Sequence, residues 1–271
     1  MRSLARAGMS VLLVAGCSVP AEPSPPNGAP AEPVTAVEVA RQRVLAALTE
    51  RENGPYQFYI DHGTARPALV GSFSSTNTRS IEIHEERTIP GRAGVATLVA
   101  LRIGQPLWIR VELDPRSLHR ELGIPTGFMR IDQDRLPPQE LLPQLVDEDG
   151  GDVAGLRDIV TAASDLREEE TRLFSGTVDL RTVEPAGALV PRSVVDGLGE
   201  RATVPLRLTF GEDRELRLDD VFHLTVTLPD GEVYRALYRE FDRTIFREAP
   251  AHAEPAPDAV YDLLDGAPAP A

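Results

Sequence analysis

The stretch that most constrains the fold is residues 95–113, which read as an antiparallel β-hairpin. Apolar residues recur at every second position in both arms, as they do in a strand with one buried face. An odd-length connection centred on Gln105 places Leu101 opposite Ile109, so the apolar sets of the two arms share one face. We expect the other face to lie in water and to offer a cation-π pair; it carries Trp108, Arg102, Arg110 and Glu112.

The segments around this hairpin alternate between strand and helix patterns. Thr35 and Glu38 form a capping box that predicts a first helix, and strands of period two follow it in series. Apolar stripes of helical period then predict helices over residues 138–146 and 153–166. Because each of these helices is apolar on one side only, both are expected to lie against the sheet.

More strands follow, interrupted by a short helix at residues 194–198. The sequence Pro229-Asp230-Gly231 is a turn signal, and a three-residue loop there pairs Val226 with Tyr234. Asp220 shares the parity of its apolar neighbours, so either a bulge turns it outward or it marks the rim of a cavity. This order predicts an α+β fold: a curled antiparallel half-barrel sheet with helices packed across its concave face.

Composition limits the chemistry that this chain can perform. A formal net charge of −14 repels phosphate backbones, which argues against nucleic acid as a partner. The chain contains no lysine, so it has no P-loop, no Ser-x-x-Lys pair and no Schiff-base lysine. Its histidines are scattered, and the acidic loop at 147–152 breaks the EF-hand pattern and is expected to be solvated. We expect no metal and no cofactor.

The single cysteine, Cys17, excludes internal disulfides and ends a secretion-type leader. Arg2 and Arg6 precede an apolar run, residues 9–15, that is too short to span a bilayer. Residues 14–17 (Val-Ala-Gly-Cys) resemble a bacterial lipobox. The resemblance implies cleavage before Cys17 and a diacylglyceryl anchor with palmitate-type chains. The alternative is an ordinary secretion signal. The chain then divides into a signal peptide (1–16), the lipidated Cys17 with a Pro/Ala-rich tether (17–33), a folded domain (34–250) and a flexible C-terminal tail (251–271).

Several segments of the folded domain resemble the LolA-like lipoproteins of the LppX and LprG kind. They are the early helix with the extended residues 56–61, Ile103-Gly104 with Trp108-Ile109-Arg110, and residues 128–132, 174–180, 204–210 and 241–242. The Gly-Thr-Val-Asp-Leu sequence within 174–180 is the most specific of them, and the acidic insert at 147–152 departs from the family pattern. The resemblance implies an open half-barrel, closed by helices around an apolar cavity for acyl chains.

The same resemblance implies that apolar side chains of the inner face contact the lipid. Periodicity alone leaves two alternatives open, because such side chains either line a cavity or pack against one another as a filled core. The residues expected to line the lipid-binding cavity are Ile81, Ile83, Val99, Leu101, Ile103, Ile109, Val111, Phe174, Val178, Leu206, Leu208, Phe210, Phe222, Leu224 and Val226.

The sequence thus predicts a non-enzymatic envelope lipoprotein that holds or carries a lipid or glycolipid by its acyl chains. We expect it to be lipid-anchored on the extracytoplasmic face of the cell membrane, with a membrane transporter as a candidate partner protein. The alternative is an interaction or sensor module of the same fold with a filled core, which binds a partner through its acidic surface. A hydrolase ranks third, because no Gly-x-Ser-x-Gly elbow is present.

Overall fold

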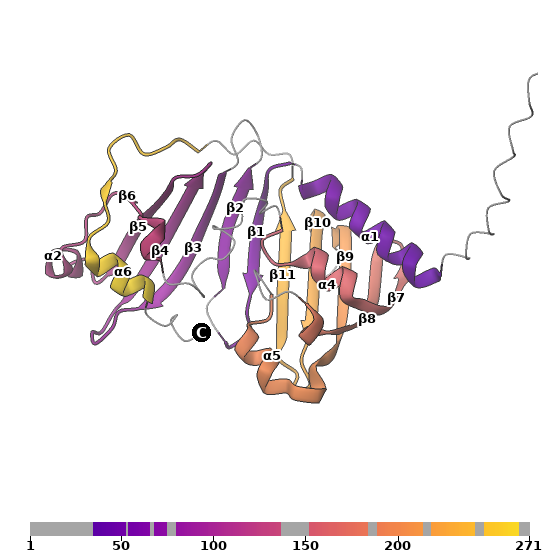
Figure 1. Cartoon of the computed structure of the whole chain (residues 1–271). Helices are drawn as coiled ribbons and strands as arrows, with labels where there is room; N and C mark the ends of the chain where they lie inside the picture. The colour runs from indigo at the N-terminus through magenta and orange to yellow at the C-terminus, as the bar shows by residue number, and fades with distance from the viewer. Residues whose placement is uncertain are drawn as a thin grey trace, which may run out of the picture. The chain divides into compact units, whose positions relative to one another are not determined.

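The computed structural model describes residues 35–52, 54–65, 68–74, 80–136, 152–183, 189–213, 218–241 and 247–265. Their strands form one twelve-stranded sheet in the order β12-β6-β5-β4-β3-β2-β1-β11-β10-β9-β8-β7 (Figure 1). The sheet is curled and unclosed. Neighbouring strands are antiparallel except β12 and β6, which are parallel.

The bounds of the elements are as follows. The strands are β1 (Tyr56–Asp61), β2 (Leu69–Ser74), β3 (Ser80–Thr88), β4 (Val95–Ile103), β5 (Leu107–Asp114), β6 (Met129–Arg130), β7 (Ala163–Glu170), β8 (Leu173–Asp179), β9 (Thr203–Asp213), β10 (Leu218–Thr227), β11 (Val233–Arg239) and β12 (Glu254–Pro255). The helices are α1 (Ala36–Glu52), α2 (Leu118–Leu122), η1 (Gln133–Arg135), α4 (Leu156–Ala162), η2 (Leu180–Thr182), α5 (Arg192–Leu198), η3 (Gly199–Ala202) and α6 (Asp258–Asp265).

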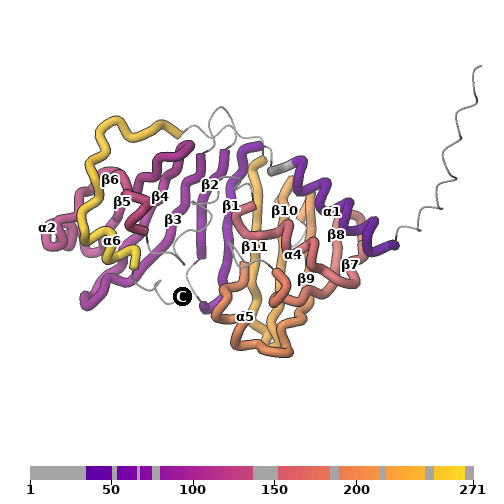
Figure 2. The backbone as a smooth tube through the Cα atoms, in the orientation of Figure 1, coloured from indigo at the N-terminus to yellow at the C-terminus, as the bar shows by residue number. Residues whose placement is uncertain are grey.

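Two meanders make up this sheet. In Figure 2, strands β1 to β6 follow one another on one side and β7 to β11 on the other. The pairing of β1 with β11 joins the two meanders into a single sheet. The predicted fold class, an α+β fold with a curled and mainly antiparallel sheet, is therefore confirmed.

The strand register defines one continuous inner face. Residues paired across antiparallel strands point to the same side, and one row runs from Ile83 through Gly71, Phe58 and Tyr238 to Phe222. In Figure 1, α1 and α4 lie in front of β7 to β11, α5 lies at the lower ends of these strands, and α6 lies in front of the β4 and β5 side. Buried apolar residues of these helices and of the inner face belong to one core cluster. The helices thus cover the concave face, as the sequence predicts.

Local signals in the second meander are confirmed in detail. The β10–β11 turn pairs Val226 with Tyr234, Leu224 with Ala236 and Phe222 with Tyr238. The register of β9 against β10 shifts between Leu218 and Val221, and the exposed Asp220 has a φ of 50°. A bulge therefore turns Asp220 outward, one of the two alternatives above.

The register predicted for the first hairpin is wrong by one residue. Arg102 pairs with Leu107 and Ala100 with Ile109, so Leu101 faces Trp108 rather than Ile109. Both faces of β4 are buried, since Leu98 is 0% exposed and Val99 is 1% exposed. When both faces of a strand are buried, the alternation of apolar residues does not show which residues point inward. The register is then determined by the length of the turn.

The outer face of this hairpin is only partly in water: the Glu112 side chain is 57% exposed, as predicted, but other side chains of this face are not. Val99, Leu101 and Trp108 are buried there, whereas Arg102 lies on the inner-face parity and is itself buried. Arg247, from the segment after β11, donates to Ser72 at 3.0 Å and pairs with Glu82 at 3.0 Å on the outer side of β2 and β3. The cation-π partner expected for Trp108 also differs, because Arg110 lies over the ring of Phe128 at 5.0 Å.

Two further boundaries differ from those expected. The helix predicted over residues 153–166 ends at Ala162, and β7 begins at Ala163 because its backbone pairs with Val178 on β8. Residues 251–265, expected in a flexible tail apart from 260–264, form β12 and α6, and the apolar face of α6 is buried. The helix predicted over 138–146 lies outside the described residues.

The two outermost strands of the sheet are short or charged. At one end, β12 consists of Glu254 and Pro255, and Pro257 follows it. At the other end, β7 runs Ala-Ser-Asp-Leu-Arg-Glu-Glu-Glu with an exposed acidic end. Proline lacks the N–H that an added strand would need, and charged side chains disfavour edge pairing.

Candidate functional site

The structure brings most of the predicted lipid-binding residues together on the inner face. They are packed against one another in the core cluster, and Phe210 stacks on Phe174 and on Phe222 with ring centroids 5.5 and 6.3 Å apart. The members of this packed set are Ile81, Ile83, Ile109, Val111, Phe174, Val178, Leu206, Leu208, Phe210, Phe222, Leu224 and Val226.

Three of the predicted residues lie elsewhere. Val99 and Leu101 are buried on the outer face, opposite His84 and Glu82 of β3. Ile103 is half-buried at the end of β4 and pairs with Ser80 on the same outer parity. The one-residue change in hairpin register moves all three away from the inner face.

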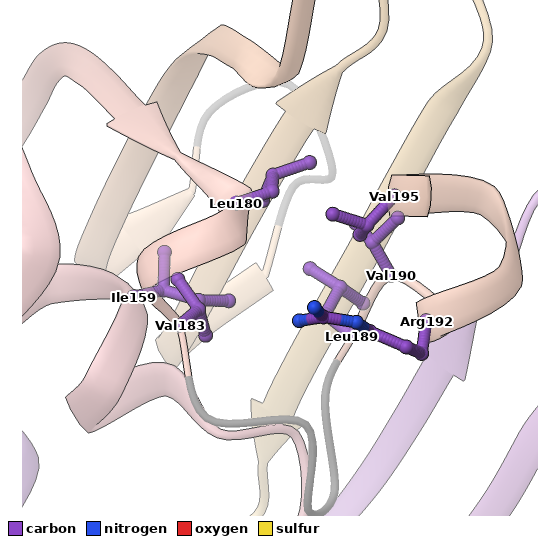
Figure 3. A pocket seen from close by; sticks show the side chains of 7 residues that line it. All are labelled: Ile159, Leu180, Val183, Leu189, Val190, Arg192 and Val195. Carbon is purple, nitrogen blue, oxygen red and sulfur yellow. The ribbon is translucent and has the colours of Figure 1, made fainter. Parts of the chain in front are cut away.

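An apolar pocket opens between the helices that cover the second meander (Figure 3). Ile159 comes from α4, and Arg192 and Val195 come from α5. Leu180 and Val183 come from η2 and its end, and Leu189 and Val190 come from the residues just before α5. The cavity volume is about 10 Å³, which is room for about one water molecule. The lining residues are Ile159, Leu180, Val183, Leu189, Val190, Arg192 and Val195.

Arg192 supplies the charged group of this pocket. Figure 3 shows its side chain extending past Leu189 toward Ile159 and Val183. Its side chain is 53% exposed, and its Nε lies 3.0 Å from Asp196 one helical turn away. An apolar pocket with an exposed guanidinium suits a molecule that has a hydrocarbon part and an anionic or polar end.

Few buried side chains attach α5 to the core on its side of the pocket. Within α5, Val195 is buried, whereas Val194 and Leu198 are only partly buried against the core. Burial of one valine contributes roughly 1.5 to 3 kcal/mol. A small displacement of α5 would therefore enlarge the pocket at modest cost.

The α4 side is held firmly by a polar network at the centre of the sheet. The Asp152 carboxylate accepts from the backbone N–H groups of Leu156 at 2.8 Å and Arg157 at 2.6 Å, which begin α4. The Tyr238 hydroxyl on β11 donates to Asp152 at 3.1 Å and accepts from the Ala154 N–H at 2.9 Å. Tyr238 thus fixes the start of α4 to the middle of the sheet.

The environment of this network favours its protonated groups. Burial raises the pKa of the Asp152 carboxyl, although three donors that favour its anion oppose the shift. Burial, followed by the neighbouring Asp152 charge, raises the pKa of Tyr238 well above the usual 10.0. Tyr238 therefore stays a hydrogen-bond donor throughout the physiological pH range.

We expect Tyr238→Phe to lower the free energy of unfolding by about 1 to 3 kcal/mol, because a buried N–H and a carboxylate each lose a partner. Urea denaturation measures this change, and exchange of the α4 amides should quicken. Tyr59→Phe is the matched control, since Tyr59 is 40% exposed, and it should change stability by under about 0.5 kcal/mol. Equal stability of Tyr238→Phe and the parent would contradict this role for the hydroxyl.

Sequence reasoning found only part of this pocket. The helical stripes that include Ile159 and Val195 were recognised as helices that cover a sheet. Leu180 continues the period of two of Phe174 and Val178 but lies in η2, whereas Val183, Leu189 and Val190 belong to no predicted strand or helix. Only the folded chain brings them together.

The described residues were also considered for metal-binding and catalytic clusters of side chains. Among the described residues, no cluster of three or more His, Cys, Asp or Glu side chains could hold a metal ion. His223 bonds Asp213 at 2.8 Å through Nδ1 and lies 3.4 Å from the Thr225 hydroxyl through Nε2, on the outer face of the sheet. These three residues line neither this pocket nor the polar pocket described next, so we assign them no catalytic role. Cys17, the predicted lipidation site, lies outside the described residues.

A second, polar pocket of about 570 Å³ lies between η1 and the start of α6. Arg135 crosses the face of Tyr261 at 3.8 Å and pairs with Asp258 at 2.7 Å. The pocket is open to solvent and is lined by Arg130, Ile131, Asp132, Gln133, Asp134, Arg135, Pro255, Ala256 and Tyr261.

Known proteins similar to this chain are found among solved structures alone. No protein-family model matches the sequence, and no curated protein matches it. Among solved structures, the chain is similar to LprF from Mycobacterium bovis, with 10% sequence identity and a TM-score of 0.47 over 79% of this chain and 98% of that one. A likeness this distant says nothing about ligands. Within the described part of the chain, the helices are too short or too polar to cross a bilayer.

Proposed function

We propose that this protein is a membrane-anchored envelope lipoprotein that binds the acyl chains of a lipid or glycolipid between its sheet and its covering helices. The observation that carries the proposal is the apolar pocket between α4 and α5, with Arg192 beside it. Six apolar side chains line this pocket, and a guanidinium at its edge can pair with a phosphate or carboxylate of the same molecule.

Binding requires the pocket to grow, because its present volume holds no acyl chain. Each methylene transferred from water contributes roughly 0.8 kcal/mol, so a chain of several methylenes offsets the loss of the Val195 contact. The firm anchorage of α4 through Tyr238 makes α5 the part that moves. The protein would store the lipid while α5 is closed and would release it for transport when α5 moves away.

The anchor remains a proposal based on the leader sequence. A diacylglyceryl group on Cys17 would hold the folded domain at the extracytoplasmic side of the membrane through the tether of residues 17–33. A membrane transporter is the proposed partner protein. We propose no enzymatic activity.

The test uses the chain from residue 18 onward, which lacks Cys17. We expect mass spectrometry of its organic extract to reveal a co-purified lipid, and we expect it to bind a fluorescent long-chain fatty acid. Val195→Asp should weaken that binding at least about tenfold, because a buried carboxylate replaces apolar lining. Val39→Asp is the matched control, since Val39 is 54% exposed on α1, and it should leave binding unchanged.

A second candidate, a protein-interaction module with a filled core, is favoured by two observations. The inner face is packed, with stacked aromatic rings at its centre. The outer face exposes neighbouring apolar side chains: Tyr59 on β1 pairs with Val70 on β2, which is 47% exposed, and with the half-buried Leu237 on β11. Absence of both co-purified lipid and probe binding would support this candidate and contradict the first.

A further inference from the structure

The polar pocket between η1 and the start of α6 is separate from the proposed lipid site. It lies at the β6 and β12 end of the sheet, whereas Tyr238, which holds α4, is on β11. The strand order puts six strand spacings between β6 and β11, which is about 29 Å along the sheet. In Figure 1, α6 and β6 lie toward one end of the sheet and α4 toward the other. The polar pocket therefore needs a ligand of its own.

The walls of the polar pocket are fixed by hydrogen bonds. The N–H of Ile131 donates to a carbonyl of β5 at 3.0 Å, and the N–H of Ala256 donates to the Arg130 carbonyl at 3.0 Å. The N–H of Asp132 donates to the Tyr261 hydroxyl at 2.9 Å, which joins η1 to α6. Walls held in this way keep their shape without a ligand, so a ligand loses little binding energy in ordering them.

The charged side chains that line the pocket balance one another. Arg130 and Arg135 contribute two guanidiniums, and Asp132 and Asp134 contribute two carboxylates. Arg135 is also paired with Asp258 at 2.7 Å, so an incoming anion would compete with that carboxylate. An anion would meet both lining carboxylates, and a cation would meet both guanidiniums. The pocket therefore favours a ligand without net charge.

Three polar groups of the pocket are available to a ligand. Within the part of the chain that the structure describes, the Arg130 guanidinium and the Asp134 carboxylate have no hydrogen-bond or ion-pair partner. The Tyr261 hydroxyl is an acceptor only, since its own proton has no acceptor among the same residues although Tyr261 is 8% exposed. A guanidinium only donates and a carboxylate only accepts, whereas an alcohol does both. A ligand with several neighbouring alcohol groups can therefore satisfy all three.

The rest of the lining is apolar. Ile131 and Ala256 are buried, and Pro255 is exposed on β12. A pyranose ring carries alcohol groups around its edge and C–H groups on its two faces, so it matches a surface that offers both polar and apolar contacts. The volume of about 570 Å³ lies within the range of small-molecule sites, roughly 300 to 1,000 Å³.

We propose that the polar pocket is a carbohydrate-binding site for a neutral saccharide. Arg130 donates to hydroxyl oxygens of the saccharide, the Asp134 carboxylate accepts from its hydroxyl groups, and Tyr261 donates its free proton. This site goes beyond the proposed function, because it requires neither an acyl chain nor the pocket beside α5. A free glycan and the headgroup of a glycolipid both carry this chemistry, and the test below separates them.

The test applies the chain from residue 18 onward to an array of neutral mono- and oligosaccharides and titrates the best binder in solution. We expect at least one pyranose-containing oligosaccharide to bind. Arg130→Gln and Asp134→Asn should each weaken that binding at least about tenfold, because a hydrogen bond to a charged group is lost. Both side chains are exposed, so neither change endangers the fold.

Two exposed residues outside the pocket provide matched controls. Arg239→Gln on the outer face of β11 and Asp262→Asn on α6 make the same chemical changes and should leave saccharide binding unchanged. Failure of every saccharide on the array to bind would overturn the site, and so would equal binding by the parent and both pocket variants. Methyl phosphate that binds as tightly as the best saccharide would also overturn it, because the pocket would then be an anion site.

The selected saccharide joined to a long acyl chain identifies its source. Equal affinity with and without the acyl chain, which the separation of the two pockets favours, supports the site with a free glycan as its ligand. A gain of at least about tenfold that Val195→Asp removes supports the site with a glycolipid headgroup as its ligand. Saccharide binding in a protein that fails to bind the fluorescent fatty acid would contradict the proposed lipid function and support this site.

Discussion

Replacement of Gly71 by alanine should destabilise this protein by about 3 kcal/mol or more, at the upper end of the cost of overpacking. A Cβ at this position would lie 2.1 Å from the Glu82 carbonyl oxygen on β3 and 2.4 Å from the ring of Phe58 on β1. The carbonyl belongs to the neighbouring strand, so relief requires β2 and β3 to separate. Phe58 is 2% exposed and has little room to move.

Urea denaturation of Gly71→Ala measures this loss. Gly127→Ala is the matched control, because a Cβ there meets nothing within 4 Å. The control should stay within about 0.5 kcal/mol of the parent protein. If Gly71→Ala is as stable as the control, the close approach of β1, β2 and β3 is wrong.

Phe222→Ala should cost about 3 to 5 kcal/mol, the usual range for truncation of a buried phenylalanine. Phe222 is 0% exposed, stacks on Phe210 and faces Tyr238 across the β10–β11 ladder. The loss should appear in the midpoint of urea unfolding with an unchanged slope. Phe222→Leu should cost clearly less, because it leaves a smaller void.

The Phe222 variant also separates a packed interior from a ligand cavity. In a packed interior, truncation leaves a dry void that takes up a small apolar molecule such as benzene. In a cavity that opens for acyl chains, truncation should cost under about 1 kcal/mol, since the ring would have few contacts to lose. Val70→Ala, an exposed apolar change on the outer face, controls for loss of apolar surface alone.

The sequence predicted the second meander better than the first. Pro229-Asp230-Gly231 determines both the turn and its register, because proline and glycine each restrict or permit one backbone conformation. The Thr35 capping box was also correct, since Glu38 N–H bonds the Thr35 hydroxyl at 3.2 Å. Signals of this kind depend on adjacent residues, so they survive without knowledge of the fold.

The register of the first hairpin was predicted wrongly because the environment of its strands is set by distant parts of the chain. Arg247 covers the outer side of β2 and β3, and it is far from them in sequence. With both faces of β4 buried, the pattern of apolar residues no longer distinguishes inside from outside. The candidate pocket was not predicted for a similar reason, because Val183, Leu189 and Val190 lie outside the predicted elements and only packing brings them to α4 and α5.

The outermost strands of the sheet bear on how this molecule behaves when many copies are crowded together. One border ends in a two-residue strand with proline, and the other carries a run of glutamates. Neither border offers a long, uncharged row of backbone donors and acceptors to a neighbouring copy. An open sheet of this width can therefore remain dispersed at high protein concentration, where an unprotected one would polymerise.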